Sequence, residues 1–174
     1  MASLRELKGR IGSIKSTQQI TKAMKMVAAS KLRKAQDKIM QMRPYAEKLN
    51  KIIAEVASVS EGQVDTPFAV ERKPDRILIV AVTSDKGLCG SFNSNVIKQV
   101  NQLLEQQYQH QHKNDSVWVM PVGKKAYDHF RKREDVQVIE TFNNLINDLS
   151  FDYAQDAATW IMDKFKEETF DKVE

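Results

Sequence analysis

The feature that most constrains this chain is a heptad repeat that runs without a slip from Leu4 at position a to Val56 at position d. Thirteen of its sixteen a and d positions are apolar, although the chain as a whole is only 41% hydrophobic. A sustained seven-residue apolar repeat indicates a coiled-coil seam. The helix predicted over residues 3–58 is about 80 Å long and cannot bury this stripe on itself, so it needs a partner helix. The large apolar seam residues are Leu4, Leu7, Ile11, Ile14, Leu32, Ile39, Met42, Leu49, Ile53 and Val56.

Local signals define the start of this helix and test its continuity. Ser3 followed by Glu6 is a capping box, which marks a helix amino terminus. Pro44 removes a backbone hydrogen bond and should kink or break a helix. The heptads continue through Pro44, which falls at position f, away from the seam, so we expect a bend in one helix. The alternative is two helices, over residues 3–42 and 45–58.

The seam changes its chemistry near residues 18–25, where Gln18, Thr21 and Lys25 occupy core positions. A local stutter in the heptads is one explanation. The other is that this segment turns a second apolar stripe towards a different partner. That stripe consists of Ile20, Met24 and Val27.

Charge is distributed unevenly along the chain. Residues 1–58 contain 13 Lys and Arg against 4 acids, a net charge of +9, whereas residues 59–174 carry −5. A basic rod of this kind could bind nucleic acid or an acidic protein surface. No aromatic residue lies between Arg5 and Lys34, which argues against base stacking on single-stranded nucleic acid.

Cysteine content and hydropathy exclude several classes of protein. Cys89 is the only cysteine, so the sequence predicts no internal disulfide and no cysteine-cluster metal site, as is typical of a reducing compartment. No apolar stretch approaches 18 residues, so we expect no transmembrane helix. The amino terminus is already a capped helix, so we expect no transit peptide in this sequence.

The rest of the chain predicts an α/β domain. Residues 61–75 contain Pro and Gly without any period and are predicted to be a linker between a helix over 1–60 and a domain over 76–174. Apolar runs predict strands over 76–83, 117–122 and 136–142, and amphipathic patterns predict helices over about 92–111, 124–132 and 153–169. This alternation indicates a Rossmann-like parallel sheet with flanking helices. The expected fold class is therefore α/β, with a long amino-terminal coiled-coil helix.

Two features suggest that the sequence continues beyond residue 174. Three strands make a thin sheet, and residues 171–174 resemble the start of a fourth. No second long helix follows residue 60 to fill the seam of the first. We therefore expect the domain to be truncated and the partner helix to lie in a missing segment.

The turn after the first strand, SDKGLCGS, is the main candidate for a ligand site. Its Gly87 and Gly90 give only G-x-x-G, one glycine short of a dinucleotide fingerprint. The second strand is followed by Gly123-Lys124-Lys125, without the acid that would bind a ribose. We therefore expect a structural turn formed by Asp85, Gly87, Cys89 and Gly90. Asp85 is expected to cap or turn the backbone, and Cys89 to be buried or half-buried.

No catalytic constellation stands out elsewhere. His110 and His112 do not share a helix face, and with His129 they are expected to be solvated surface residues. The sequence predicts no catalytic residue, no metal site and no cofactor.

Three motifs carry a specific resemblance. They are MASLRELKGRIGSIKSTQQITKAMKMVAASKLRKAQ at residues 1–36, RPYAEKL at residues 43–49 and TSDKGLCGSFN at residues 83–93. In this order and spacing they resemble the amino-terminal portion of the γ subunit of bacterial F-type ATP synthases, and the resemblance covers essentially the whole chain.

The resemblance implies a central-stalk rotor subunit without chemistry of its own. In that family the long helix pairs with a carboxy-terminal helix inside the ring of α and β subunits, and the α/β domain sits beside the ε subunit on the c-ring. The subunit is peripheral, on the cytoplasmic face of the bacterial plasma membrane. It touches the membrane only through the c-ring and binds no nucleic acid. The residues that would contact the catalytic ring are Ile20, Lys22, Met24, Lys25, Val27, Lys31, Arg33 and Lys34.

Two other functions fit the pattern of the residues, considered without the resemblance, less well. A nucleotide-dependent α/β enzyme with a helical arm would bind nucleotide stoichiometrically through residues 70–174. A coiled-coil nucleic-acid-binding module would lose affinity steeply as salt rises. A rotor subunit predicts neither behaviour.

Overall fold

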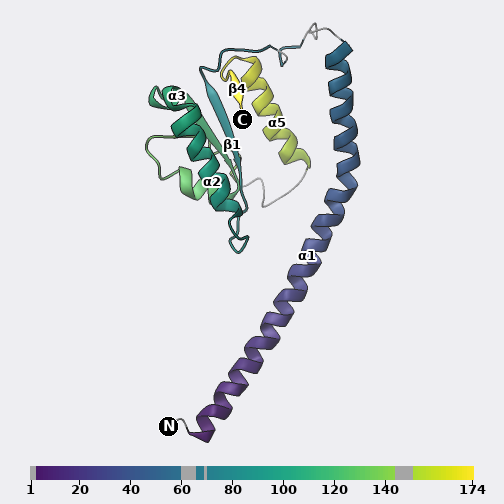
Figure 1. The fold of residues 1–174 in the computed structure, drawn as a ribbon, viewed down its shortest axis with the longest axis vertical. Coiled ribbons are helices and arrows are strands. Elements are labelled where there is room, and N and C mark those ends of the chain that lie inside the picture. The colour runs from purple at the N-terminus through teal and green to yellow at the C-terminus, as the bar shows by residue number, and fades with distance from the viewer. Residues whose placement is uncertain (1–2, 60–65, 69, 144–150) are drawn as a thin grey trace. The chain divides into compact units, whose positions relative to one another are not determined.

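The computed structural model describes residues 3–59, 66–68, 70–143 and 151–174. The chain divides into a helical unit, Met1–Val64, and a sheet unit, Asp65–Glu174. The arrangement of the two units relative to each other is not determined (Figure 1).

The described part of the helical unit is dominated by one helix, α1, which spans Leu4–Val59 and forms a curved ribbon (Figure 1). The Ser3 Oγ accepts a hydrogen bond from the backbone N–H of Glu6 at 3.3 Å, as expected of a capping residue. The helix continues through Pro44 without ending. The prediction of a single helix is therefore confirmed, and the two-helix alternative is wrong.

The sheet unit contains four parallel strands in the order β3-β2-β1-β4. Their bounds are β1 Ile77–Val82, β2 Val117–Val122, β3 Gln137–Val138 and β4 Lys172–Val173. β1 and β2 pair along their whole length, from Ile77 opposite Val117 to Val82 opposite Val122. The α/β class and the parallel sheet are confirmed, and β4 is the strand expected over residues 171–174.

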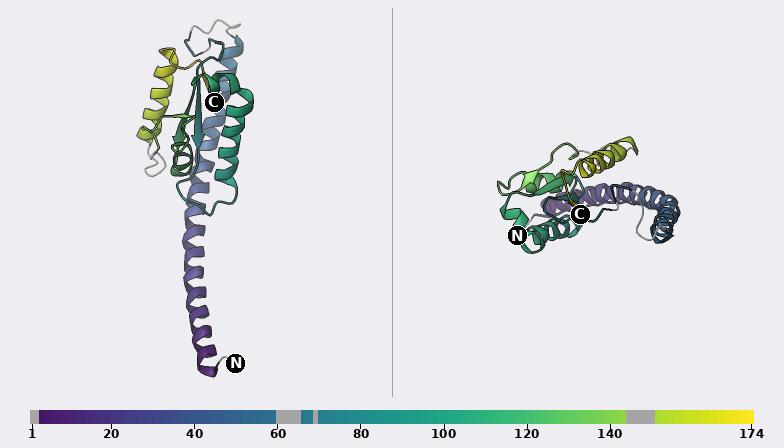
Figure 2. Two further views of the ribbon diagram at one scale, coloured as in Figure 1. Left: turned by 90° about the vertical axis from the view of Figure 1, so that its left-hand side faces the viewer. Right: turned by 90° about the horizontal axis from the view of Figure 1, so that it is seen from above.

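Helices cover both faces of this sheet. Figure 2 shows the sheet between α2 on one side and α5 on the other. The helical segments of the sheet unit are α2 Phe92–Gln102, η1 Leu103–Gln107, α3 Gln109–Lys113, α4 Lys124–Phe130 and α5 Phe151–Lys166.

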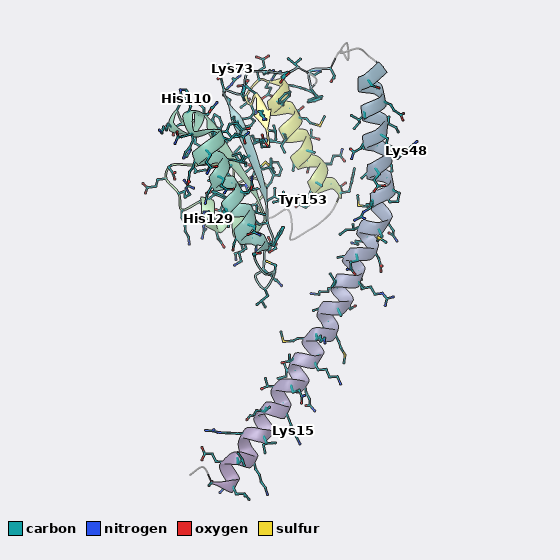
Figure 3. The ribbon with its side chains drawn as sticks, viewed as in Figure 1. Lys15, Lys48, Lys73, His110, His129 and Tyr153 are labelled. Atoms are coloured by element: carbon teal, nitrogen blue, oxygen red, sulfur yellow. The ribbon has the colours of Figure 1, made fainter. Side chains whose placement is uncertain are left out.

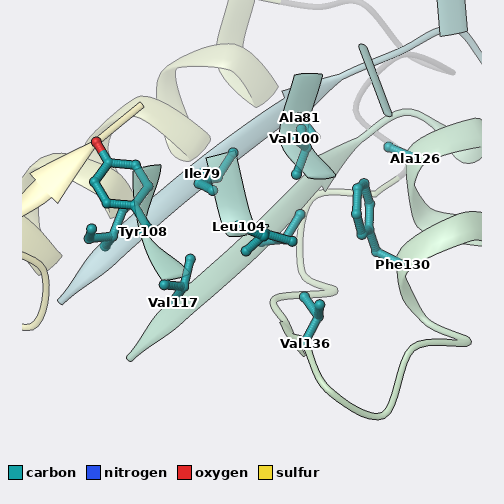
Figure 4. Close-up of a cluster of buried hydrophobic side chains, with 11 residues drawn as sticks. Ile79, Ala81, Val100, Leu104, Tyr108, Val117, Ala126, Phe130 and Val136 are labelled. Atoms are coloured by element: carbon teal, nitrogen blue, oxygen red, sulfur yellow. The ribbon is translucent and has the colours of Figure 1, made fainter. Parts of the chain in front are cut away.

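β1 forms the centre of two hydrophobic clusters because its side chains alternate between the two faces. Ile77, Ile79 and Ala81 pack with α2, η1 and α4 in the cluster of Figure 4. Leu78 faces the other way and packs with Met120 and residues of α5. The continuous apolar run thus corresponds to a strand buried on both faces, as predicted.

A π-helical turn interrupts the helix that was predicted to be continuous over 92–111. The segment Leu103–Gln107 is π-helical, and the N–H of Tyr108 donates to the carbonyl of Leu103 at 2.8 Å. Leu104 and Tyr108 are both buried there, at 0% and 3% exposure. The Tyr108 hydroxyl donates to a carboxylate oxygen of Glu174 at 2.6 Å, so the interruption joins this helix to the sheet edge.

The third strand is much shorter than the predicted range of 136–142. Only Gln137–Val138 is a strand, extended by one hydrogen bond from the N–H of Ile139 to the carbonyl of Val119. Val136 is nevertheless buried, and Phe142 packs edge-on against Trp160 with 5.8 Å between ring centroids. The apolar residues of this run therefore contribute to the core without forming a ladder at the sheet edge.

Helix α5 begins and ends earlier than predicted. Phe151 is already helical, so Asp152 lies inside the first turn and is not the N-cap. The loop expected before this helix falls on residues 144–150, which lie outside the described residues. At the other end Glu168 has φ 57°, and the N–H of Thr169 returns to the carbonyl of Lys164 at 2.9 Å. A left-handed residue closed in this way ends a helix.

The inward-facing side of α5 does not include all of its alanines. Ala157 is buried and Ile161 is half-buried, but Ala154 and Ala158 are exposed. The buried side of α5 is centred on Ala157, Trp160 and Ile161, all of which pack in the second cluster.

The described second half of the predicted linker packs on α5. The ring of Phe68 stacks on Phe165 with 6.1 Å between centroids. Arg72 lies over the same ring at 4.6 Å, and its Nη1 donates to the Phe165 carbonyl at 2.8 Å. This stretch belongs to the sheet unit because an aromatic and a guanidinium anchor it there.

Candidate partner-binding surface

The candidate functional surface is the length of helix α1. Every described side chain of this helix is exposed within the helical unit, and Figure 3 shows them projecting all along it, Lys15 and Lys48 among them. Exposure of large apolar side chains to water is unfavourable. Burying a Leu or Ile side chain stabilises a protein by about 1.5–3 kcal/mol relative to leaving it exposed. An apolar surface of this extent marks an interaction site.

The seam residues predicted from the heptads all lie on this exposed helix. Leu4 is 74% exposed and Ile14 67%, whereas Leu49, one of the most covered, is still 46% exposed. The complete set is Leu4, Leu7, Ile11, Ile14, Leu32, Ile39, Met42, Leu49, Ile53 and Val56.

Three of the predicted ring-contact residues share one face of the same helix. Ile20, Met24 and Val27 are spaced i, i+4 and i+7, so they share one face, and each is more than half exposed. The five basic residues predicted to accompany them are also exposed, namely Lys22, Lys25, Lys31, Arg33 and Lys34. The structure thus places the whole set on about four consecutive turns of α1, with exposed side chains.

A shallow hollow lies where the seam becomes polar. Its volume is about 600 Å³, and the Thr21 hydroxyl beside it donates to the Thr17 carbonyl at 2.8 Å. That hydroxyl is satisfied within its own helix, so a partner need not supply a polar group here. The hollow is lined by Ser13, Ile14, Thr17, Gln18, Thr21, Lys22 and Lys25.

Electrostatics favour an acidic partner for this surface. Glu6 is the last acid before a stretch from Leu7 to Gln36 that contains only basic charges. Glu6 itself pairs with Arg10 at 3.6 Å, one turn away. The basic residues of this stretch are Lys8, Arg10, Lys15, Lys22, Lys25, Lys31, Arg33 and Lys34.

The turn after β1 is held by side-chain hydrogen bonds to the backbone. Asp85 Oδ1 accepts from the N–H of Lys124 at 2.8 Å, so this carboxylate caps α4 and not the helix that follows the turn. Gly90 has φ 62°, a conformation that suits glycine, and Gly87 precedes it in an open part of the loop. Leu88 also has a positive φ, 63°, and is fully exposed. Sequence reasoning missed Leu88, although a leucine between two glycines of a turn was an available signal.

Cys89 is exposed, which contradicts the prediction that it is buried or half-buried. The turn is stabilised by its own polar contacts and does not pack its side chains into the core. Asn93 Nδ2 donates to the Cys89 Sγ at 3.1 Å, and the Ser84 Oγ lies 3.7 Å from the same sulfur.

The three histidines differ in burial. His110 is exposed as predicted, but the prediction is wrong for His112 and His129, which are half-buried. His112 Nε2 lies 3.3 Å from Asp135 Oδ2. His129 packs edge-on against Phe130, and its buried Nε2 has no hydrogen-bond partner among the described residues. Burial lowers the pKa of His129, with further contributions from Arg133 and Lys132.

A cavity of about 660 Å³ lies beside the turn, near the carboxyl ends of β1 and β2, where α/β sheets commonly bind ligands. Asp85 already occupies the amino terminus of α4, and Arg131 is paired with Asp128 at 3.3 Å. Among the described residues, no group of three potential ligands could hold a metal ion. We therefore assign no chemistry to this cavity, whose lining is Asp85, Lys86, Lys124, Tyr127, Asp128, Arg131 and Asn143.

Comparison with known proteins identifies the family of this chain. The family model described as ATP synthase matches residues 3–174. The chain is 45% identical to the ATP synthase gamma chain of Cytophaga hutchinsonii over all of its 174 residues, and 44% identical to that of Christiangramia forsetii over 99% of its length. The chain therefore belongs to the ATP synthase family, among bacterial γ chains.

The match is complete for this chain but partial for its relatives. It spans 59% of the Cytophaga hutchinsonii protein and 58% of the Christiangramia forsetii protein. Within the described residues, no helix is both long and apolar enough to cross a membrane.

Proposed function

We propose that this chain is the amino-terminal part of a central-stalk rotor subunit, which transmits torque between a proton-driven c-ring and a catalytic ring of α and β subunits. The observation that carries the proposal is the exposed surface of α1, a 56-residue helix with an uncovered heptad seam. The match to the ATP synthase family over residues 3–174 supports it.

The physical properties of α1 suit a rotating shaft. Two long helices packed along a heptad seam form a stiff coiled coil, which can carry torsion from one end to the other. The exposed lysines and arginines suit a sliding contact, because solvent-exposed ion pairs contribute only about 0–1 kcal/mol each and are readily exchanged. A rotor needs both properties on one element.

The proposed partners follow from these two surfaces. The seam would pair with a carboxy-terminal helix of the same subunit, and the stretch Ile20–Lys34 would contact acidic loops of the α and β ring. The sheet unit would lie at the foot of the stalk, against the ε subunit and the c-ring, on the cytoplasmic face of the membrane. The subunit would perform no catalysis and bind no cofactor or nucleic acid.

Charge reversal in the basic stretch tests this proposal. Lys25→Glu, Lys31→Glu and Lys34→Glu, introduced together into the γ subunit of an assembled ATP synthase, should lower proton pumping per ATP hydrolysed several-fold. The reason is that three attractive contacts with the ring become repulsive. The measurement is ATP-driven acidification of vesicles, compared with ATP hydrolysis by the same sample.

A matched control reverses three charges elsewhere on the same helix. Arg5→Glu, Lys48→Glu and Lys51→Glu change the net charge equally but lie outside the ring-contact set, so coupling should be retained. Normal coupling in the first triple variant would contradict the assignment of its lysines to the ring contact.

A further inference from the structure

The charges of α1 are sorted by heptad position. Seven of its thirteen basic residues occupy e and g positions, which flank the seam. All four acids lie at b, c or f, away from the seam: Glu6, Asp37, Glu47 and Glu55. The flanking basic residues are Lys8, Lys15, Lys22 and Arg43 at e, and Arg10, Lys31 and Lys38 at g.

From this sorting we infer that the seam selects a helix whose own flanking positions are acidic, and that it rejects a second copy of this chain. The inference deepens the proposed function and rests on it, because it specifies the chemistry of the partner helix. Side chains at e and g lie beside the seam and face the flanking positions of the opposing helix.

Self-pairing of α1 would bring like charges together in either orientation. In a parallel pair, e positions face g positions of the partner; in an antiparallel pair, e faces e and g faces g. Both sets contain basic residues and neither contains an acid. Like charges across a seam are destabilising and therefore act against the homodimer that the apolar repeat alone would favour.

The described structure leaves these flanking charges available to a partner. The seven basic residues at e and g are exposed, as are the described seam residues between them. Among the described residues, Arg10 is the only one of the seven that forms a salt bridge, with Glu6 on its own helix, and its side chain is still 71% exposed. An acidic helix would thus meet basic side chains along both edges of the seam.

Synthetic helices with leucine at every a and d position provide the probe. Three peptides carry Glu, Gln or Lys at all e and g positions and are otherwise identical. Their affinity for the 174-residue chain is measured by fluorescence anisotropy at low and high salt. We expect the Glu peptide to bind at least about tenfold more tightly than the Gln peptide at low salt, with the ratio falling as salt screens the charges. The Lys peptide should bind most weakly.

Variants of the chain assign this preference to the seam edges. Lys8→Glu, Lys15→Glu and Arg43→Glu, all at e and all outside the ring-contact set, should abolish the preference for the Glu peptide. The matched control changes Arg5, Lys48 and Lys51, at b, c and f, to Glu and should largely retain it.

The outcomes separate the inference from the proposed function. Equal affinity for the Glu and Gln peptides would overturn the inference that the seam selects an acidic helix. It would not contradict the proposal that the seam binds a partner helix. Equal loss of preference in both triple variants would also overturn the inference, because net charge alone would then explain the binding. Binding by none of the three peptides overturns the seam itself, and with it both proposals. In sedimentation at low salt the chain should show no self-association through α1, and a stable dimer abolished by Ile39→Asp would overturn the rejection of a second copy.

Discussion

The two units of this chain treat their apolar side chains in opposite ways. In the sheet unit, Ile77, Leu78 and Phe130 are 0% exposed and pack against helices of the same unit. In the helical unit, Ile39 and Leu32 are 57% and 59% exposed although they belong to an equally regular pattern. Burial of apolar surface thus folds the sheet unit internally, whereas the apolar side chains of the helical unit stay exposed. This difference is the reason why we propose a binding function for the helical unit.

The largest expected difference between the units comes from truncating apolar side chains. Phe130→Ala removes a fully buried ring and should lower the free energy of unfolding of the sheet unit by about 3–5 kcal/mol. Ile39→Ala on α1 should leave that unfolding transition unchanged, because this side chain contacts solvent and Ala favours helix.

Tryptophan fluorescence during urea unfolding separates the two effects. Both tryptophans of the chain, Trp118 and Trp160, lie in the sheet unit and pack in its second cluster. Their emission therefore reports on that unit alone. A shift of this transition by Ile39→Ala of the size caused by Phe130→Ala would show that the seam is already covered within the chain, and the contrast between the units would be lost.

The second expected effect concerns the ion pair that joins the start of β1 to the segment before β4. The side chain of Asp171 is only 7% exposed. Its carboxylate accepts a hydrogen bond from Arg76 Nη2 at 2.7 Å and another from the backbone N–H of Arg76 at 2.8 Å. Asp171→Asn should cost about 1.5–3 kcal/mol of sheet-unit stability, since hydrogen bonds to charged groups contribute about that much. Asp75→Asn is the matched control, because Asp75 and its partner Lys73 are both largely exposed.

The same pair gives a pH dependence with a definite sign. Its hydrogen bonds to Arg76 lower the pKa of Asp171. A depressed folded-state pKa adds stability above the unfolded value of about 3.9 and loses it as pH falls through the lower folded value. Urea midpoints measured from pH 6 down to pH 3 should therefore fall less steeply in Asp171→Asn than in the parent chain. Parallel curves would remove Asp171 as a source of acid sensitivity.

Long-period features of the molecule could be predicted from the sequence. The heptads of α1 and the apolar runs of β1 and β2 each repeat one physical requirement over several turns or residues, so local exceptions such as Pro44 do not hide them. The surface residues followed directly, because a residue's face on a long regular helix depends only on its spacing. The charge sorting along the seam is readable from the sequence in the same way.

Features set by a single local contact could not be predicted. β3 has only two paired residues because the edge of the sheet offers one neighbour, and its apolar residues pack without a ladder. The π-turn ends at Tyr108, whose hydroxyl donates to Glu174, 66 residues further along the chain, and no local sequence pattern predicts such a contact. Cys89 is exposed in a turn that is held by local polar contacts with Asn93 and Ser84, and no periodicity in the sequence predicts such contacts.

The smallest expected effect comes from His129, and it sharpens the contrast between the units because all three histidines lie in the sheet unit. Burial lowers the pKa of His129 below its ordinary value of about 6.5. The unfolded chain therefore takes up this proton more readily, and stability falls as pH decreases below about 6.5. His129→Gln should reduce the loss of sheet-unit stability between pH 7 and pH 5, whereas the exposed His110→Gln should not. His112 is present in both variants, so its pairing with Asp135 cancels in the comparison.

Tryptophan fluorescence during urea unfolding measures this loss of stability. An identical loss in both variants would contradict the prediction, because protonation of the His129 ring in the folded chain would then carry no free-energy penalty.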